Sequence, residues 1–134
     1  MSDQSDRRAI RERLEAYADA VFRRDATAWA ANWVDDGEWD LAGTKVRGRD
    51  QIVAVWNGAM AQFSFVGFFV QLGEVQISGD SATARSYTTE YLTQTDGQRR
   101  RVIGTYEDRL VRRGDTWLFA GRSYRILNDT EEKL

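Results

Sequence analysis

Asp108 stands out among the polar residues because the stretch around it alternates as a β-strand that should bury one face. The face that includes Asp108 also carries Val102, Gly104, Tyr106 and Leu110. A carboxyl group among mostly apolar side chains must be paired, hydrogen-bonded or protonated. Asp108 is therefore either a pocket acid with a raised pKa that donates a hydrogen bond or moves a proton, or a structural acid paired with Arg122 or bonded to Tyr17.

Aromatic side chains supply the expected walls of a pocket. Tyr17 lies on the apolar face of the first expected helix, where it is either a core residue whose hydroxyl finds a partner or a donor that faces a ligand. Tryptophans recur at core-facing positions, which favours core and pocket wall over a stacking platform. We expect five residues to contact a ligand: Trp39, Trp56, Phe68, Tyr106 and Arg122.

The 134-residue chain contains no cysteine and no histidine. The first absence excludes disulfides, thiol nucleophiles and thiolate metal sites. The second removes the commonest general base and the commonest metal ligand. We therefore expect no metal site and no cofactor, and any acid–base chemistry must use Asp, Glu, Tyr, Lys or Arg.

Three helices in the first half of the chain should position these residues. A period of 3.6 runs from Asp6 to Arg24, with Ser5 or Asp6 as its N-cap, and Asp25 should cap a second helix over residues 26–34. Residues 35–37 have turn chemistry, and 38–42 alternate as a short strand with Trp39 and Leu41 opposite Asp40. A glycine-punctuated loop over 43–48 leads to a third helix over about 50–63.

The second half of the chain changes to a period of 2. Strands are expected over 65–78, 82–94, 99–111 and 117–127, joined by tight turns into an antiparallel meander, with a polar tail after the last. The alternation of the first strand slips at Gly73, as a β-bulge would make it do in a strand that must bend. Helices followed by strands predict an α+β fold.

The ordered motifs "WVDDGEW", "GTKVRGRDQI", "GDSATARSY", "GTYEDRLVRRGDTW" and "FAGRSY" resemble the nuclear transport factor 2-like superfamily, and within it the SnoaL-like branch. The resemblance implies one domain over residues 1–134. It also implies a cone-like α+β barrel, in which three N-terminal helices pack on a curved antiparallel sheet around an apolar pocket. The superfamily includes ketosteroid isomerase, polyketide cyclases, scytalone dehydratase and plain binding domains.

The resemblance also carries site residues over to this chain. Tyr17 falls where ketosteroid isomerase, a standard example of pKa tuning, has its oxyanion-hole tyrosine. Asp108 falls where that enzyme keeps a protonated aspartic acid. The position of the base falls on Leu41, so the neighbouring Asp40 is the candidate base only if it turns inward. The histidine common in SnoaL-like relatives falls at about Phe68.

Two functions are compatible with this pattern. One is a cofactor-independent isomerase, cyclase or dehydratase acting on a hydrophobic carbonyl compound such as a polyketide or steroid-like ring, with Asp108, Tyr17 and Asp40 as catalytic residues. The other is a non-catalytic domain that binds a small apolar ligand or mediates dimerisation, which the missing histidines and Leu41 favour.

Composition constrains the partners of the chain. The net charge of −2 gives no reason to expect nucleic acid as a partner. No stretch is long and apolar enough to span a membrane, and the polar N-terminus is unlike a signal peptide. We therefore expect a cytoplasmic protein. The expected partner is a small hydrophobic molecule. The run of phenylalanines over 63–69 is too apolar for a solvated sheet, which predicts that it lines the pocket or is covered in a homodimer.

Overall fold

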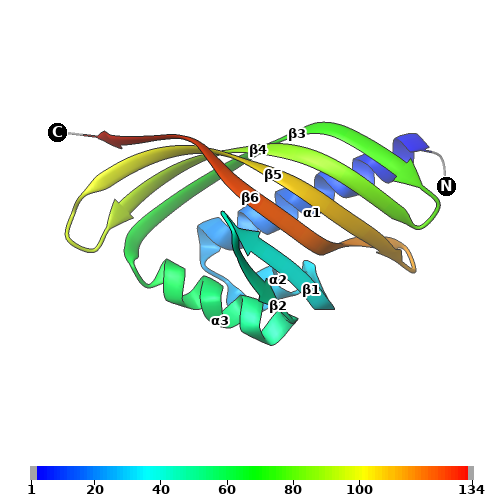
Figure 1. Ribbon diagram of the computed structural model, residues 1–134, viewed down its shortest axis with the longest axis horizontal. Coiled ribbons are helices and arrows are strands. Elements are labelled where there is room, and N and C mark those ends of the chain that lie inside the picture. Colours follow the sequence, from blue (N-terminus) through cyan, green and yellow to red (C-terminus); the bar gives the residue numbers. More distant parts are fainter. Residues whose placement is uncertain (1–2, 133–134) are drawn as a thin grey trace.

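The computed structural model describes residues 3–132 and consists of one curved sheet with helices against its concave side (Figure 1). The six strands are ordered β2-β1-β6-β5-β4-β3. Their bounds are Trp33–Leu41 (β1), Thr44–Arg47 (β2), Phe63–Ser78 (β3), Ser81–Gln94 (β4), Arg99–Arg113 (β5) and Thr116–Glu132 (β6). The predicted α+β cone, with its helices N-terminal to a curved and mostly antiparallel sheet, is confirmed.

The three helices are α1 (Asp3–Arg23), α2 (Ala26–Ala30) and α3 (Arg49–Met60). Helix α1 crosses under the long strands and contributes its apolar face to the core (Figure 1). Asp25 caps α2 by accepting a hydrogen bond from the amide of Ala28 at 3.0 Å, as predicted. The predicted N-cap of α1 is wrong, because Ser5 and Asp6 both lie inside the helix. The buried carboxylate of Asp6 instead accepts a hydrogen bond from the indole of Trp117 at 3.2 Å.

The bend in β3 gives the sheet its curvature. Even-numbered residues face inward from Val66 to Leu72 and odd-numbered residues do so from Val75, and the pairing with β4 shifts between Leu72 and Val75. Gly73 lies in this irregular segment, and a β-carbon there would approach the Arg85 carbonyl oxygen to 3.0 Å. The predicted bulge at Gly73 is therefore confirmed, and it lets a 16-residue strand wrap around the helices.

The segment after α2 differs from its prediction. Helix α2 ends at Ala30 instead of continuing to Val34, and the predicted turn at 35–37 lies inside β1. Strand β1 pairs in parallel with β6. Between Trp33 and Glu38, β1 has more residues than the matching segment of β6, so the turn-like sequence forms an irregularity within the strand. The predicted loop over 43–48 contains β2, which pairs with β1 as a hairpin. Of the two strands, β1 contributes lining residues to the apolar cavity, namely Trp39 and Leu41.

The core lies between the helices and the concave face, and the convex face is left uncovered. Trp29 and Trp33 are fully buried in this core. On the convex face Phe65 and Phe69 are about half exposed, whereas Phe63 and Phe68 of the same strand point inward and line a cavity. The phenylalanine run thus divides between the two faces of β3. No helix within residues 3–132 is long and apolar enough to cross a membrane.

Candidate active site

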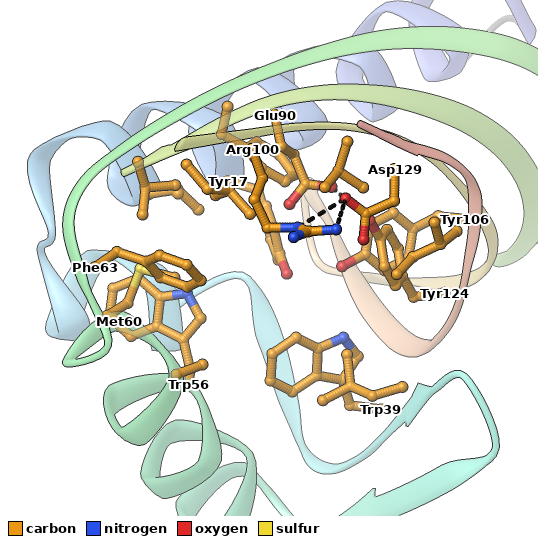
Figure 2. Close-up of a pocket in the computed structure, with 18 of the residues that line it drawn as sticks. Tyr17, Trp39, Trp56, Met60, Phe63, Glu90, Arg100, Tyr106, Tyr124 and Asp129 are labelled. Atoms are coloured by element: carbon orange, nitrogen blue, oxygen red, sulfur yellow. Dashed lines mark hydrogen bonds and ion pairs between the residues drawn. The ribbon is translucent and has the colours of Figure 1, made fainter. Parts of the chain in front are cut away.

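A cavity of about 300 Å³ opens between the concave face of the sheet and α3 (Figure 2). Its walls are largely apolar, and they include four of the five predicted ligand contacts: Trp39, Trp56, Phe68 and Tyr106. The polar lining residues come mostly from the sheet and comprise Tyr17, Glu90, Gln94, Arg100, Tyr106, Tyr124 and Asp129. A mainly apolar concavity with a few polar groups has the usual composition of a small-molecule site.

The floor of the cavity is built from stacked indoles. Trp56 of α3 stacks on Trp29 with ring centroids 4.7 Å apart and planes 12° apart, and Trp29 packs in turn on Trp39 of β1 at 5.3 Å. The indole N–H groups of Trp29 and Trp39 are buried without a hydrogen-bond partner in the described chain. The prediction that the tryptophans form core and pocket wall therefore describes their positions correctly.

Glu90 of β4 places a carboxyl group inside this apolar cavity. Its Oε2 accepts a hydrogen bond from the Tyr124 hydroxyl at 2.6 Å and from the Thr88 hydroxyl at 3.0 Å. No hydrogen bond engages its Oε1 within residues 3–132. Burial raises the pKa of Glu90, although the bonds from Tyr124 and Thr88 oppose the shift. The group can therefore accept or release a proton closer to neutral pH than an ordinary glutamate.

The room for this contact comes from Gly104 on β5, two residues before Tyr106, which is the residue paired with Tyr124. A β-carbon at Gly104 would lie 2.6 Å from the Tyr124 hydroxyl oxygen, so any other residue there would push the ring away from Glu90. Tyr124 also packs against Tyr106, with ring centroids 4.8 Å apart. Burial, followed by the nearby Glu90, raises the pKa of Tyr124, so its hydroxyl stays protonated and donates.

Tyr17 faces the same cavity from α1. Burial raises its pKa, with Arg122 opposing, and burial raises the pKa of Tyr106 further, so both phenols stay neutral. Tyr17, Glu90, Tyr106 and Tyr124 gather on one side of the cavity, across from Trp39 and Trp56 (Figure 2). The predicted pocket position of Tyr17 thus matches the structure, and neutral phenols next to a carboxyl group form a set of hydrogen-bond donors beside a possible base.

Asp108 lies behind this set and does not line the cavity. Its two oxygens accept from Nε and Nη2 of Arg122 at 2.7 and 3.1 Å, and Ser86 donates to the same carboxylate at 3.5 Å. Both members of the pair are almost fully buried, with exposed side-chain fractions of 1% for Arg122 and 0% for Asp108. The structure therefore supports the ion-pair interpretation and leaves Asp108 without direct access to a ligand.

Arg122 is the one predicted ligand contact that does not line the cavity. Its guanidinium carbon lies 3.7 Å from the ring centroid of Tyr106 and 4.5 Å from that of Tyr17, so it supports both phenols from behind. Burial opposes its charge, but Asp108 and the neighbouring phenols hold the pKa of Arg122 above its usual value. Arg122 acts on the site as a buried positive charge and a packing support.

Asp40 points away from the cavity, as simple alternation along β1 predicts. Trp39 and Leu41 line the cavity, whereas the Asp40 carboxylate accepts from the amide of Gly43 at 2.8 Å and shapes the β1–β2 turn. The one-residue shift that would turn Asp40 inward does not occur. Asp40 is therefore not placed to act as a base.

Five polar residues of the site were not identified from the sequence: Glu90, Gln94, Arg100, Tyr124 and Asp129. Glu90 and Tyr124 form one pair, and Arg100 and Asp129 form an ion pair at 2.8 Å that Figure 2 marks with dashed lines. The signal for Glu90 was its alternation with Ala82 and Ala84, which places it on the inner face of β4. Arg100 was hidden in a run of three arginines, and Asp129 in what resembled a polar tail.

No group of three or more acidic side chains in the described part of the chain could hold a metal ion. The donor set of the cavity is likewise unsuited to a metal, because Glu90 and Asp129 are the acids that line it and each already accepts hydrogen bonds from a neighbour. What these residues can do without a metal is bind an apolar ring, donate hydrogen bonds to an oxygen and exchange a proton.

A cone-shaped α+β domain with a pocket between sheet and helices defines a large class of small-molecule enzymes and binding proteins. Within that class, residues 2–123 match the model of the SnoaL-like domain, so this chain belongs to the SnoaL-like domain family. No curated protein matches the chain in a sequence search.

Solved structures of similar shape support the same fold. A candidate scytalone dehydratase from Novosphingobium aromaticivorans has a TM-score of 0.89 at 20% identity, covering 98% of this chain and 91% of its own. The hexachlorocyclohexane dehydrochlorinase LinA-type3 from Novosphingobium barchaimii has a TM-score of 0.86 at 19% identity, with coverages of 96% and 91%. A protein of unknown function from Mycobacterium tuberculosis has a TM-score of 0.81 at 25% identity, with coverages of 92% and 77%.

Proposed function

We propose that this protein is a cofactor-independent isomerase, cyclase or dehydratase that moves a proton on a hydrophobic carbonyl compound. The observation that carries the proposal is the Glu90 carboxyl group, which is held by Tyr124 inside a mostly apolar cavity. The dehydratase and dehydrochlorinase activities named for two proteins of similar fold are lyase reactions of this general kind. That likeness is one of fold, so the assignment rests on the site.

The chemistry starts with the free oxygen of Glu90. The ionised carboxylate takes a proton from a carbon next to the carbonyl, the C–H electron pair forms the carbon–carbon double bond of an enolate, and the carbonyl oxygen gains the negative charge. The hydroxyl of Tyr17 is the donor that faces this oxygen, and it is worth most in a water-poor cavity. In an isomerisation the carbonyl re-forms and the enolate electron pair takes the proton back from Glu90 at another carbon. In a dehydration the carbonyl re-forms, the carbon–carbon double bond shifts to the neighbouring carbon, the bond from that carbon to its hydroxyl group breaks, and Glu90 gives its proton to the departing oxygen.

The proposal replaces Asp108 and Asp40 as the acid–base residues. Asp108 is bound on both oxygens by Arg122, and Asp40 is turned toward Gly43. Tyr17 keeps the role that the sequence resemblance gives it. A second candidate function, a domain that binds a small apolar ligand without turnover, is favoured by Leu41, which places an aliphatic side chain in the cavity where ketosteroid isomerase carries its base.

Proton exchange on hydrophobic ketones in deuterium oxide, followed by NMR, separates the two functions. We expect the protein to speed the exchange of carbon-bound protons in steroid-like and polyketide-like ketones. Leu92→Trp should fill the cavity and abolish the exchange, because Leu92 lines it. The matched control is Tyr91→Trp on the convex face of the same strand, which should leave it intact. Binding of these ketones without exchange would support the non-catalytic domain.

A homodimer is proposed as the assembly of the chain, and the surface that favours it is the convex face of β3, β4 and β5. Its exposed apolar side chains are Phe65, Phe69, Tyr87, Tyr91 and Ile103. Covering them would remove a contiguous apolar patch from water. We expect Phe69→Glu to shift the sedimentation mass from two chains to one, whereas a wild-type mass of one chain would contradict the dimer.

A further inference from the structure

Arg100 is the basic side chain among the residues that line the cavity, and it lies where the cavity meets solvent. It extends from β5 toward Asp129 of β6, and the two side chains are about one-third exposed, at 31% and 33% (Figure 2). Val102, the next inward-facing residue on β5, is opposite Glu90 in the sheet. Arg100, which forms the charged rim of the cavity together with Asp129, therefore lies one inward-facing residue along β5 from the level of Glu90.

The guanidinium of Arg100 has N–H donors that make no hydrogen bond in the described residues. Its Nε and Nη2 both contact the same oxygen of Asp129, at 2.9 and 2.8 Å. Nη1 makes no hydrogen bond within residues 3–132. A guanidinium offers five N–H groups in a planar fork that matches a carboxylate, and this one keeps part of the fork unused at the edge of an apolar cavity.

From this arrangement we propose that the ligand of the cavity is an aromatic or other flat apolar compound that carries a carboxylate, and that Arg100 binds that carboxylate at the rim. The ring lies against Trp39 and Trp56, and its carboxylate contacts the unused edge of Arg100 in addition to, or in place of, Asp129. The inference deepens the proposed function, and it rests on that function only in placing an apolar ligand in this cavity.

The position of Arg100 makes this exchange favourable. Asp129 is on the partly exposed end of β6, so it regains water when a ligand takes its place. Arg100 is itself partly solvated, so binding a carboxylate does not require a deeply buried charge to be desolvated. By contrast, Arg122 is unavailable to a ligand, because Asp108 and Ser86 occupy its Nε and Nη2 within the core.

Two probes of the same shape test the proposal without any need for turnover. They are beta-naphthoate, which is an anion at neutral pH, and methyl beta-naphthyl ketone, which is neutral. Isothermal titration calorimetry at low salt should give tighter binding of beta-naphthoate to the wild-type protein. In Arg100→Gln the dissociation constant of beta-naphthoate should rise about tenfold, as for the loss of one charge-assisted contact, while that of the ketone stays within about twofold.

Two further variants separate a specific contact from overall charge. Arg101→Gln removes the same charge from the next, outward-facing residue and should leave both dissociation constants unchanged. Asp129→Asn removes the competing carboxylate and should tighten beta-naphthoate alone. The preference for the anion should shrink as salt is added, because the rim is partly exposed.

The outcomes distinguish this inference from the proposed function. If the ketone binds and Leu92→Trp blocks it, but Arg100→Gln leaves beta-naphthoate unchanged, the cavity binds ligands and the role of Arg100 is overturned. If Arg100→Gln tightens beta-naphthoate, or if Arg101→Gln weakens it equally, the role is also overturned. If neither probe binds to the wild-type protein, both the use of the cavity and the carboxylate contact are overturned.

Discussion

Glu90→Gln should lower the rate of proton exchange on a substrate ketone by about 100-fold or more, which is the usual contribution of a positioned general base. Glutamine has the same shape and its amide oxygen can still accept from Tyr124 and Thr88, which are 2.6 and 3.0 Å from the Glu90 carboxylate. The substitution therefore removes proton transfer and preserves the geometry. NMR exchange rates, measured at saturating ketone, are the readout.

The exchange rate of the wild-type protein should decrease at low pH, as a general base at Glu90 requires. Only ionised Glu90 can take a proton, and burial raises its pKa, so the rate should fall as pH is lowered through a value above that of an ordinary glutamate. A rate that stays flat down to the usual glutamate range would contradict the assignment of Glu90 as base.

The raised pKa of Glu90 also predicts how the free energy of unfolding depends on pH. Because the folded protein holds the Glu90 proton more tightly than the unfolded chain, this residue makes the free energy of unfolding fall as pH rises from the unfolded to the folded pKa. Glu90→Gln should remove that fall and be no less stable than wild type at neutral pH. Asp40→Asn is the matched control, since Asp40 contacts Gly43 and not the cavity, and it should retain full exchange.

Arg122→Met should lower the free energy of unfolding by about 3–5 kcal/mol, measured by urea denaturation. The pair with Asp108 is almost completely excluded from water, so removing one partner leaves an uncompensated charge in the core. The methionine also loses the cation–π contacts with Tyr17, Tyr106 and Phe119, whose ring centroids lie 3.7–4.5 Å from the guanidinium carbon. A small loss would mean that Asp108 is readily protonated or hydrated.

A double variant separates the charge from the packing. Arg122→Met combined with Asp108→Leu removes both charges, and it should be more stable than Arg122→Met alone because no unpaired carboxylate remains. The matched comparison is Arg85→Met, which breaks an exposed ion pair with Glu107 at 2.9 Å between β4 and β5. Arg85→Met should change stability far less, since water solvates both of its partners. Equal losses from Arg85→Met and Arg122→Met would contradict the importance of burial.

The interior of the site also shows why sequence alternation was informative for some residues. Trp39 and Leu41 were placed on the face opposite Asp40 by the two-residue period of a strand, and the structure has that arrangement. The same period placed Asp108 on an inner face, where it is buried. These are local properties, because the direction of a side chain relative to its neighbours on one strand depends on the backbone of that strand alone.

The sequence did not decide which residue pairs with Asp108. An acid on an apolar face needs a counter-charge or a proton, and Arg122 on the next strand was one of the possibilities. Only the register of β5 against β6 decided it, by placing Asp108 directly opposite Arg122. That register includes two shifts, which no hairpin length in the sequence reveals.

The sequence by itself therefore determined the fold class, the number and order of the helices, the bend at Gly73 and the absence of histidine chemistry, because periodicity, turn residues and composition are local or additive properties. Tertiary structure decided the residues of the site. The parallel pairing of β1 with β6 joins segments about eighty residues apart, and the curvature of the sheet brings Glu90, Tyr124 and Arg100 into one cavity. Such contacts depend on how distant strands are aligned and bent, and this information belongs to no single segment of the chain.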